Sequence, residues 1–128
     1  DLGFGVPVYG TITEDDGTMI PAGEAAGFVL EFPNGYSIYH AGDTGVFGDM
    51  RLIGDMYRPD LAMLPIGDRF TMGPREAARA IELIGVEAVI PIHHGTFDML
   101  TGTPEQLVSA TAGMDVEIIT LEPGGTLA

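Results

Sequence analysis

The amino-acid sequence predicts a layered α/β fold, and three observations lead to it. Asn34-Gly35 lies between two apolar runs, which is the strongest short-range signal for a β-hairpin. The short apolar runs 61–65 and 88–92 have the length and composition of buried strands. Helical patterns lie between these runs, and strands that alternate with helices are typical of an α/β sheet with helical layers.

The N-terminal third is expected to hold one irregular segment followed by the hairpin. Glycines and prolines interrupt residues 1–27, so we expect an irregular segment with one strand at Val6–Ile12 and a turn at 14–17. The hairpin strands are expected at Phe28–Phe32 and Tyr36–His40.

Two helices are expected around the strand at 61–65. Residues 47–56 have the pattern of a short helix. A second helix should begin at Gly73-Pro74, because proline favours the first helical position, and end at Gly85, a glycine C-cap.

The C-terminal part predicts one more helix and the last strand. Thr103 and Gln106 form a capping-box pattern, so a helix should begin there, and Gly113 should end it. The apolar run Glu117–Leu121 follows as the last strand, so the 128 residues are expected to form a single unit.

Composition excludes several classes of function. Nineteen acidic residues against five basic ones, all arginine, give a net charge of −14, which opposes binding to nucleic acid or to anionic membranes. The absence of lysine removes P-loop and Schiff-base chemistry, and the absence of cysteine removes disulfides and thiolate sites. No apolar run is long enough to span a bilayer and no signal peptide is visible, so we expect a cytoplasmic location.

All three histidines follow predicted strands. His40 precedes a Gly-rich turn with Asp43, His93 and His94 follow the run 88–92, and Asp68 follows the run 61–65. Imidazole and carboxylate groups in such loops are the ligands that borderline divalent metals take. The alternative interpretation, that these are ordinary polar loop residues, stays open from the spacing alone.

Other chemistries have weaker support. Ser37 lies in a predicted strand and Ser109 in a predicted helix, and neither occupies the sharp turn of a serine nucleophile. Asp43-Thr44-Gly45 spells the motif of aspartic proteases, whose small forms pair two such aspartates in a dimer. The helical pattern after residue 73 disagrees with an all-β protease, so this remains a remote alternative.

Several motifs occur in one order and carry a resemblance to a known family. They are YHAGDTG at 39–45, FGDM at 47–50, PDLAMLPIGD at 59–68, FTMGP at 70–74, and IPIH at 90–93 followed by TF at 96–97. Together they resemble the predicted metal-dependent hydrolases of the metallo-β-lactamase superfamily, over about residues 25–107.

The resemblance implies half of a four-layer αββα sandwich, a mixed sheet with helices on one face, and a two-metal site at its edge. Asp43 is then the carboxylate that bridges the metals and His93 a ligand of the second metal, so these two residues are the expected catalytic pair. Further residues are expected to line the pocket or to orient the ligands: His40, Thr44, Asp68 and His94. The implied reaction is hydrolysis of a small-molecule substrate by a metal-bridging hydroxide.

One part of the superfamily pattern is absent. The motif His-x-His-x-Asp-His does not occur, and residues 1–39 contain no histidine. A catalytic zinc takes three protein ligands and water, so Asp43 and His93 do not complete a site. We therefore expect the metal, most simply zinc but also manganese, iron or nickel, to need an N-terminal metallo-β-lactamase half or a second copy of the chain. The alternative is a non-catalytic half-fold that self-associates and binds metal weakly or not at all.

Overall fold

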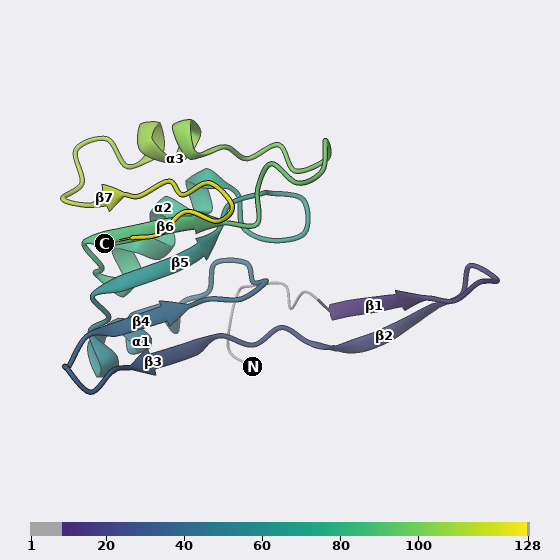
Figure 1. The fold of residues 1–128 in the computed structure, drawn as a ribbon, viewed down its shortest axis with the longest axis horizontal. Helices are drawn as coiled ribbons and strands as arrows, with labels where there is room; N and C mark the ends of the chain where they lie inside the picture. The colour runs from purple at the N-terminus through teal and green to yellow at the C-terminus, as the bar shows by residue number, and fades with distance from the viewer. Residues whose placement is uncertain (1–8, 128) are drawn as a thin grey trace.

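A five-stranded mixed sheet forms the centre of the molecule. The computed structural model describes residues 9–127, and Figure 1 shows the sheet with the strand order β3-β4-β5-β6-β7. Strand β3 pairs antiparallel with β4, and the later neighbours pair in parallel. The strands span Phe28–Glu31 (β3), Ser37–His40 (β4), Leu61–Pro65 (β5), Ala88–Ile92 (β6) and Glu117–Ile118 (β7).

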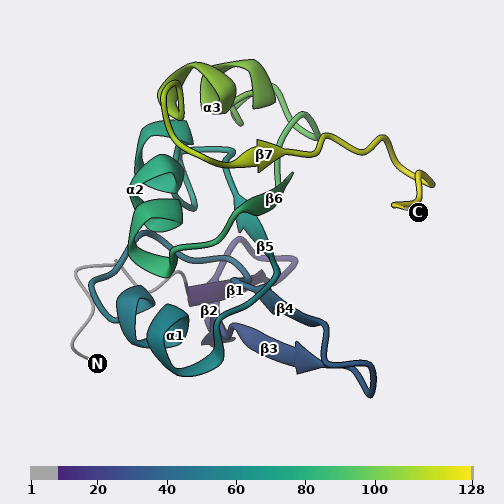
Figure 2. The same cartoon turned by 90° about the vertical axis from the view of Figure 1, so that its left-hand side faces the viewer.

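Three helices lie together on one face of this sheet (Figure 2). They are α1 (Met50–Tyr57), α2 (Pro74–Ile84) and α3 (Pro104–Ala110), and α2 contacts both of the others. The core lies between the two layers and includes Tyr39, Met50, Ala62, Leu64, Ile81, Val89 and Leu107. The predicted mixed sheet with helices on one face is therefore confirmed.

The other face of the sheet carries apolar side chains that none of the three described helices covers. Phe28 pairs with His40 and Leu30 with Ile38, so these four side chains share the face opposite to Val29 and Tyr39, which pack with the core. Phe28 is 61% exposed and Leu30 is 48% exposed. The segment after β7 leaves the sheet on this side in Figure 2. We call this surface, defined by Phe28, Leu30 and Ile38, the bare face.

The prediction of an irregular segment over residues 1–27 is wrong for most of the residues that the structure describes. Strands β1 (Tyr9–Thr13) and β2 (Met19–Glu24) form an antiparallel hairpin that extends beyond the sheet in Figure 1. The predicted turn at 14–17 is confirmed, and the Asp16 carboxylate accepts a hydrogen bond from the Thr18 N–H at 2.8 Å. Glycine and proline suggested broken structure, but a two-stranded ribbon has two edges and tolerates both residues. The part of the predicted strand before residue 9 lies outside the described residues.

The remaining boundaries differ from the predictions only at element ends. Helix α1 begins at Met50, three residues after the expected start, and β7 ends at Ile118. Helix α3 ends at Ala110 rather than at Gly113. The Thr111 hydroxyl donates to the Leu107 carbonyl at 2.9 Å, which satisfies a helix-end acceptor before Gly113 is reached. No helix among residues 9–127 is long and apolar enough to cross a membrane.

The capping box of α3 supports a first prediction. Thr103 Oγ1 accepts the Gln106 N–H at 3.3 Å, and Gln106 Oε1 accepts the Thr103 N–H at 2.9 Å. Thr103→Ala removes one of these bonds and is expected to lower the free energy of unfolding by about 1 kcal/mol. Ser109→Ala removes an exposed hydroxyl from the same helix and should change it by less than about 0.5 kcal/mol. Urea unfolding of both variants is the measurement, and equal losses would contradict the prediction.

Candidate metal centre

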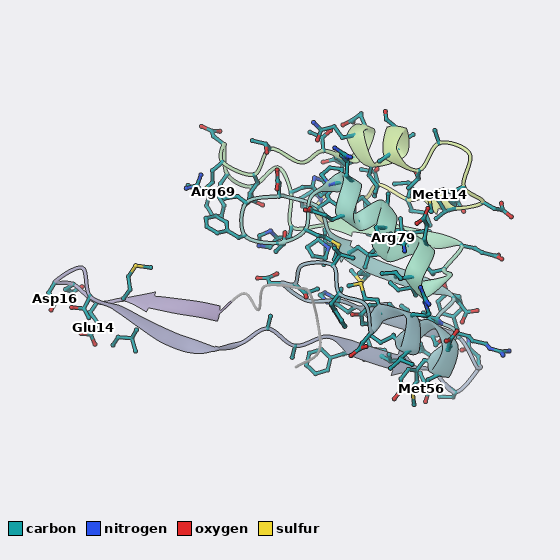
Figure 3. The ribbon with its side chains drawn as sticks, turned by 180° about the vertical axis from the view of Figure 1, so that it is seen from behind. Glu14, Asp16, Met56, Arg69, Arg79 and Met114 are labelled. Carbon is teal, nitrogen blue, oxygen red and sulfur yellow. The ribbon has the colours of Figure 1, made fainter. Side chains whose placement is uncertain are left out.

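The loops that follow β4, β5 and β6 meet at one edge of the sheet, because the three strands are parallel. Backbone hydrogen bonds join them: Met72 N–H donates to the Thr44 carbonyl at 3.0 Å, and Gly102 N–H donates to the Gly67 carbonyl at 3.4 Å. Figure 3 shows Arg69 at this edge, well away from the hairpin tip that carries Glu14 and Asp16. The edge is therefore a set of connected loops.

Asp43 and His93 face one another across this edge. The His93 Nε2 atom lies 3.7 Å from the Asp43 Oδ2 atom, and the two side chains are 29% and 57% exposed. Two ligand atoms placed at roughly 2.0–2.2 Å from a tetrahedral ion are about 3.4 Å apart. An imidazole nitrogen and a carboxylate oxygen at this separation fit two ligand positions around one divalent metal, and their exposure leaves the other positions open.

His93 has an unusual backbone and an unpartnered nitrogen. Its φ of 55° lies in the left-handed region, which non-glycine residues seldom adopt without support from their surroundings. Its Nδ1 atom is buried and has no hydrogen-bond partner among residues 9–127. No group in the described part of the chain therefore competes for the ring from that side, and the Nε2 atom is the one that faces Asp43.

His40 and Thr44 flank Asp43 in the chain, at the end of β4 and in the loop that follows it. His40 is half-buried, and its Nδ1 atom accepts a hydrogen bond from the Gly42 N–H at 3.1 Å. A neutral His40 then carries its proton on Nε2, so it presents a donor rather than a metal-binding lone pair. The Thr44 hydroxyl donates to the Gly45 carbonyl at 2.9 Å, and its backbone carbonyl accepts the Met72 amide. Through these hydrogen bonds both residues stabilise the loop that contains Asp43.

Asp68 and His94 lie in the loops that follow β5 and β6. Asp68 lines a cavity of about 500 Å³ beside the start of α2, together with Glu76 and Arg79. The pKa of the Glu105 carboxyl, at the start of α3, lies below its ordinary value, mainly through a hydrogen bond with its own backbone and one with Thr103. His94 is half-buried, and its backbone carbonyl accepts a hydrogen bond from the Thr96 hydroxyl at 3.4 Å.

The number of donors remains two. Among residues 9–127, no group of three or more His, Cys, Asp or Glu residues is arranged to hold a metal ion. The sequence reasoning missed Met72, whose amide ties the β5 loop to the β4 loop. It lies in the FTMGP motif at 70–74, so the motif could have indicated it. The roles proposed for Asp43, His93 and the four nearby residues stay predictions.

The fold and this edge define a protein of the metallo-β-lactamase type. Residues 6–94 match the family described as the Beta-lactamase superfamily domain, and the chain belongs to that family. The predicted superfamily is therefore confirmed. The remote alternative of an aspartic protease requires an all-β chain, whereas the described part of this chain contains three helices.

Curated relatives and a solved structure agree with the assignment. A "UPF0173 metal-dependent hydrolase" of Rubrobacter xylanophilus is 52% identical over 132 residues, which cover 96% of this chain and 54% of the relative. A protein of the same name from Chloroflexus aurantiacus is 53% identical over 116 residues, covering 89% and 48%. The metallo hydrolase Igni18 of Ignicoccus hospitalis superposes with a TM-score of 0.67 at 31% identity, over 95% of this chain and 50% of that one. The chain spans about half the length of the curated relatives that it matches.

Proposed function

We propose that this chain supplies part of the centre of a metal-dependent hydrolase, with Asp43 and His93 as ligands of a divalent metal. The single observation that carries the proposal is the 3.7 Å separation between His93 Nε2 and Asp43 Oδ2 at the open edge of the sheet. The names of the relatives point the same way. When bound, the metal would act as a Lewis acid and lower the pKa of water, which is the chemistry of hydrolysis.

The residues of this chain would hold and orient the site. Asp43 contributes the anionic donor and His93 the neutral one, which suits zinc, manganese, iron or nickel. His40 Nδ1 accepts a hydrogen bond from the Gly42 N–H, and this bond fixes the backbone just before Asp43. The net charge of −14 favours a small, non-polymeric substrate over nucleic acid, because phosphate backbones require a basic surface.

We further propose that the missing ligands come from another polypeptide segment. Two donors are fewer than the three that a catalytic zinc takes. The bare face supports this proposal, since Phe28 and Leu30 are apolar and exposed where a second sheet would bury them. The segment is an N-terminal metallo-β-lactamase half or a second copy of this chain.

Native mass spectrometry of the purified protein, before and after treatment with a chelator, tests the proposed function. Assemblies that lose the mass of a metal ion on chelation support a metal centre, and the accompanying polypeptide mass identifies the second segment. Multiples of 13.5 kDa without metal would contradict the hydrolase and favour the self-associating half-fold. Metal-dependent turnover is then measured on an ester, a thioester, a phosphodiester and a lactam.

The two adjacent histidines provide a matched pair of variants. His93→Ala removes the donor that faces Asp43 and is expected to weaken metal binding by at least about 100-fold, the upper end of the loss seen when only an outer partner is removed. His94→Ala removes the adjacent imidazole, which forms no ion pair with Asp43 among the described residues, and should change metal binding by less than about tenfold. Calorimetric titration with Zn²⁺ measures both variants. Equal losses would contradict the assignment of His93 as the ligand.

A further inference from the structure

Gly67 lies directly against the backbone of His93. A Cβ atom added to Gly67 would lie 2.2 Å from the His93 carbonyl oxygen and 3.2 Å from Leu100 Cδ2. Carbon and oxygen atoms in close contact remain about 3.3 Å apart, so an alanine here would displace the His93 carbonyl. Leu100 is buried, and its Cδ2 atom borders the same position, so an added methyl group has little free space there.

The contact occurs where β6 turns into the loop with the proposed ligand. The Ile66 N–H donates to the Ile92 carbonyl at 3.0 Å, so the regular pairing of β5 and β6 continues up to the residue before His93. His93 itself has a φ of 55°. A left-handed residue of this kind persists only where its surroundings hold it. The atoms of Gly67 are part of those surroundings.

We propose that Gly67 is a positioning residue for His93. Because Gly67 has no side chain, the His93 carbonyl oxygen packs directly against the Gly67 backbone. This contact holds the left-handed turn at His93, which directs Nε2 toward Asp43. A side chain at residue 67 would rotate the peptide after His93 and swing the imidazole away from Asp43. The consequence for metal binding rests on the proposed function, but the orientation of the ring does not.

The test compares Gly67→Ala with Gly54→Ala. A Cβ atom on Gly54 would lie 2.0 Å from the Ile84 carbonyl oxygen, so this control introduces a similar contact between α1 and the end of α2. The first readout is the NMR signals of the His93 ring in metal-free protein, assigned with His93→Ala. The second readout is the affinity for Co²⁺. Thermal unfolding measures how far each substitution lowers the melting temperature.

Gly67→Ala is expected to shift the His93 ring signals and to weaken Co²⁺ binding by about 10- to 100-fold. Gly54→Ala should leave both unchanged while lowering the melting temperature at least as much. Unchanged ring signals in Gly67→Ala, or equal shifts in Gly54→Ala, would overturn the proposal. If the assembly with the second segment binds no Co²⁺, the proposed function fails, and the ring signals of this chain still decide the role of Gly67.

A second pair of variants serves if Gly67→Ala does not fold. Leu100→Ala removes the side chain behind Gly67, which leaves space for the double variant Gly67→Ala/Leu100→Ala to fold. Displaced His93 signals in the double variant, compared with Leu100→Ala alone, support the positioning role. Identical His93 signals in the two proteins would overturn it.

Discussion

Replacing Asp43 by alanine is expected to abolish metal binding while the fold persists. The carboxylate faces His93 Nε2 at 3.7 Å and supplies the only anionic donor that the structure shows in contact with that ring within the described residues. Removal of a ligand should weaken binding by at least about 100-fold, since removal of an outer partner alone costs 10- to 100-fold. Calorimetric titration with Zn²⁺ is the measurement, made on the metal-binding assembly that native mass spectrometry identifies.

The fold should tolerate this change, because the Asp43 side chain is 57% exposed. Its loss should alter the free energy of unfolding by less than about 0.5 kcal/mol. Asp115→Ala makes the same change in net charge at an exposed residue before β7 and is the matched control. It should bind metal as the parent does. Full metal stoichiometry in Asp43→Ala would show that this carboxylate is not a ligand.

Gly85→Val is expected to have the largest effect on folding. Gly85 ends α2 with a φ of 72°, and its N–H donates to the Ile81 carbonyl at 2.8 Å. Nothing lies within 4 Å of an added Cβ atom, so the cost is conformational strain rather than a clash. A β-branched residue in the left-handed region should lower the free energy of unfolding by about 1–3 kcal/mol.

Gly48→Val is the control for this prediction. Gly48 is also exposed, and nothing lies within 4 Å of its added Cβ atom, but its φ lies outside the left-handed range. The control should therefore change stability by less than about 0.5 kcal/mol. Chemical unfolding of both variants separates the effect of backbone strain on stability from the effect of adding a valine side chain. Equal stability of Gly85→Val and the parent would mean that the helix does not need a left-handed end.

The sequence predicted the parts of the fold in which local signals and burial agree. Strands β5 and β6 match their predicted bounds, because short apolar runs between turn residues leave few alternatives. Helix α2 also matches, since Pro74 and Gly85 mark its two ends chemically. The β1–β2 hairpin was missed because its stability depends on pairing across a turn, which glycine and proline counts do not report.

The sequence indicated which residue types gather after the strands, but it could not predict the direction in which their side chains point. The sequence placed Asp43 and His93 just after two predicted strands, and in the structure their side chains lie 3.7 Å apart. The same reasoning assigned Asp68 and His94 to the pocket. Asp68 lines a cavity beside the start of α2, and both assignments stay predictions. Side-chain direction depends on turn geometry, such as the left-handed backbone at His93, and that geometry is a product of tertiary contacts.

The position of β5 between the two donors has a consequence for how the pair forms. Asp43 follows β4 and His93 follows β6, so about fifty residues of chain separate them. Closing a flexible loop of that length costs about 3.5 kcal/mol beyond a constant term. This loop-closure entropy is lost when the parallel sheet folds, because the pairing of β4, β5 and β6 fixes the distance between Asp43 and His93. If Asp43 and His93 are metal ligands as proposed, an incoming ion encounters two donors that are already adjacent, and its binding does not have to order the chain between them.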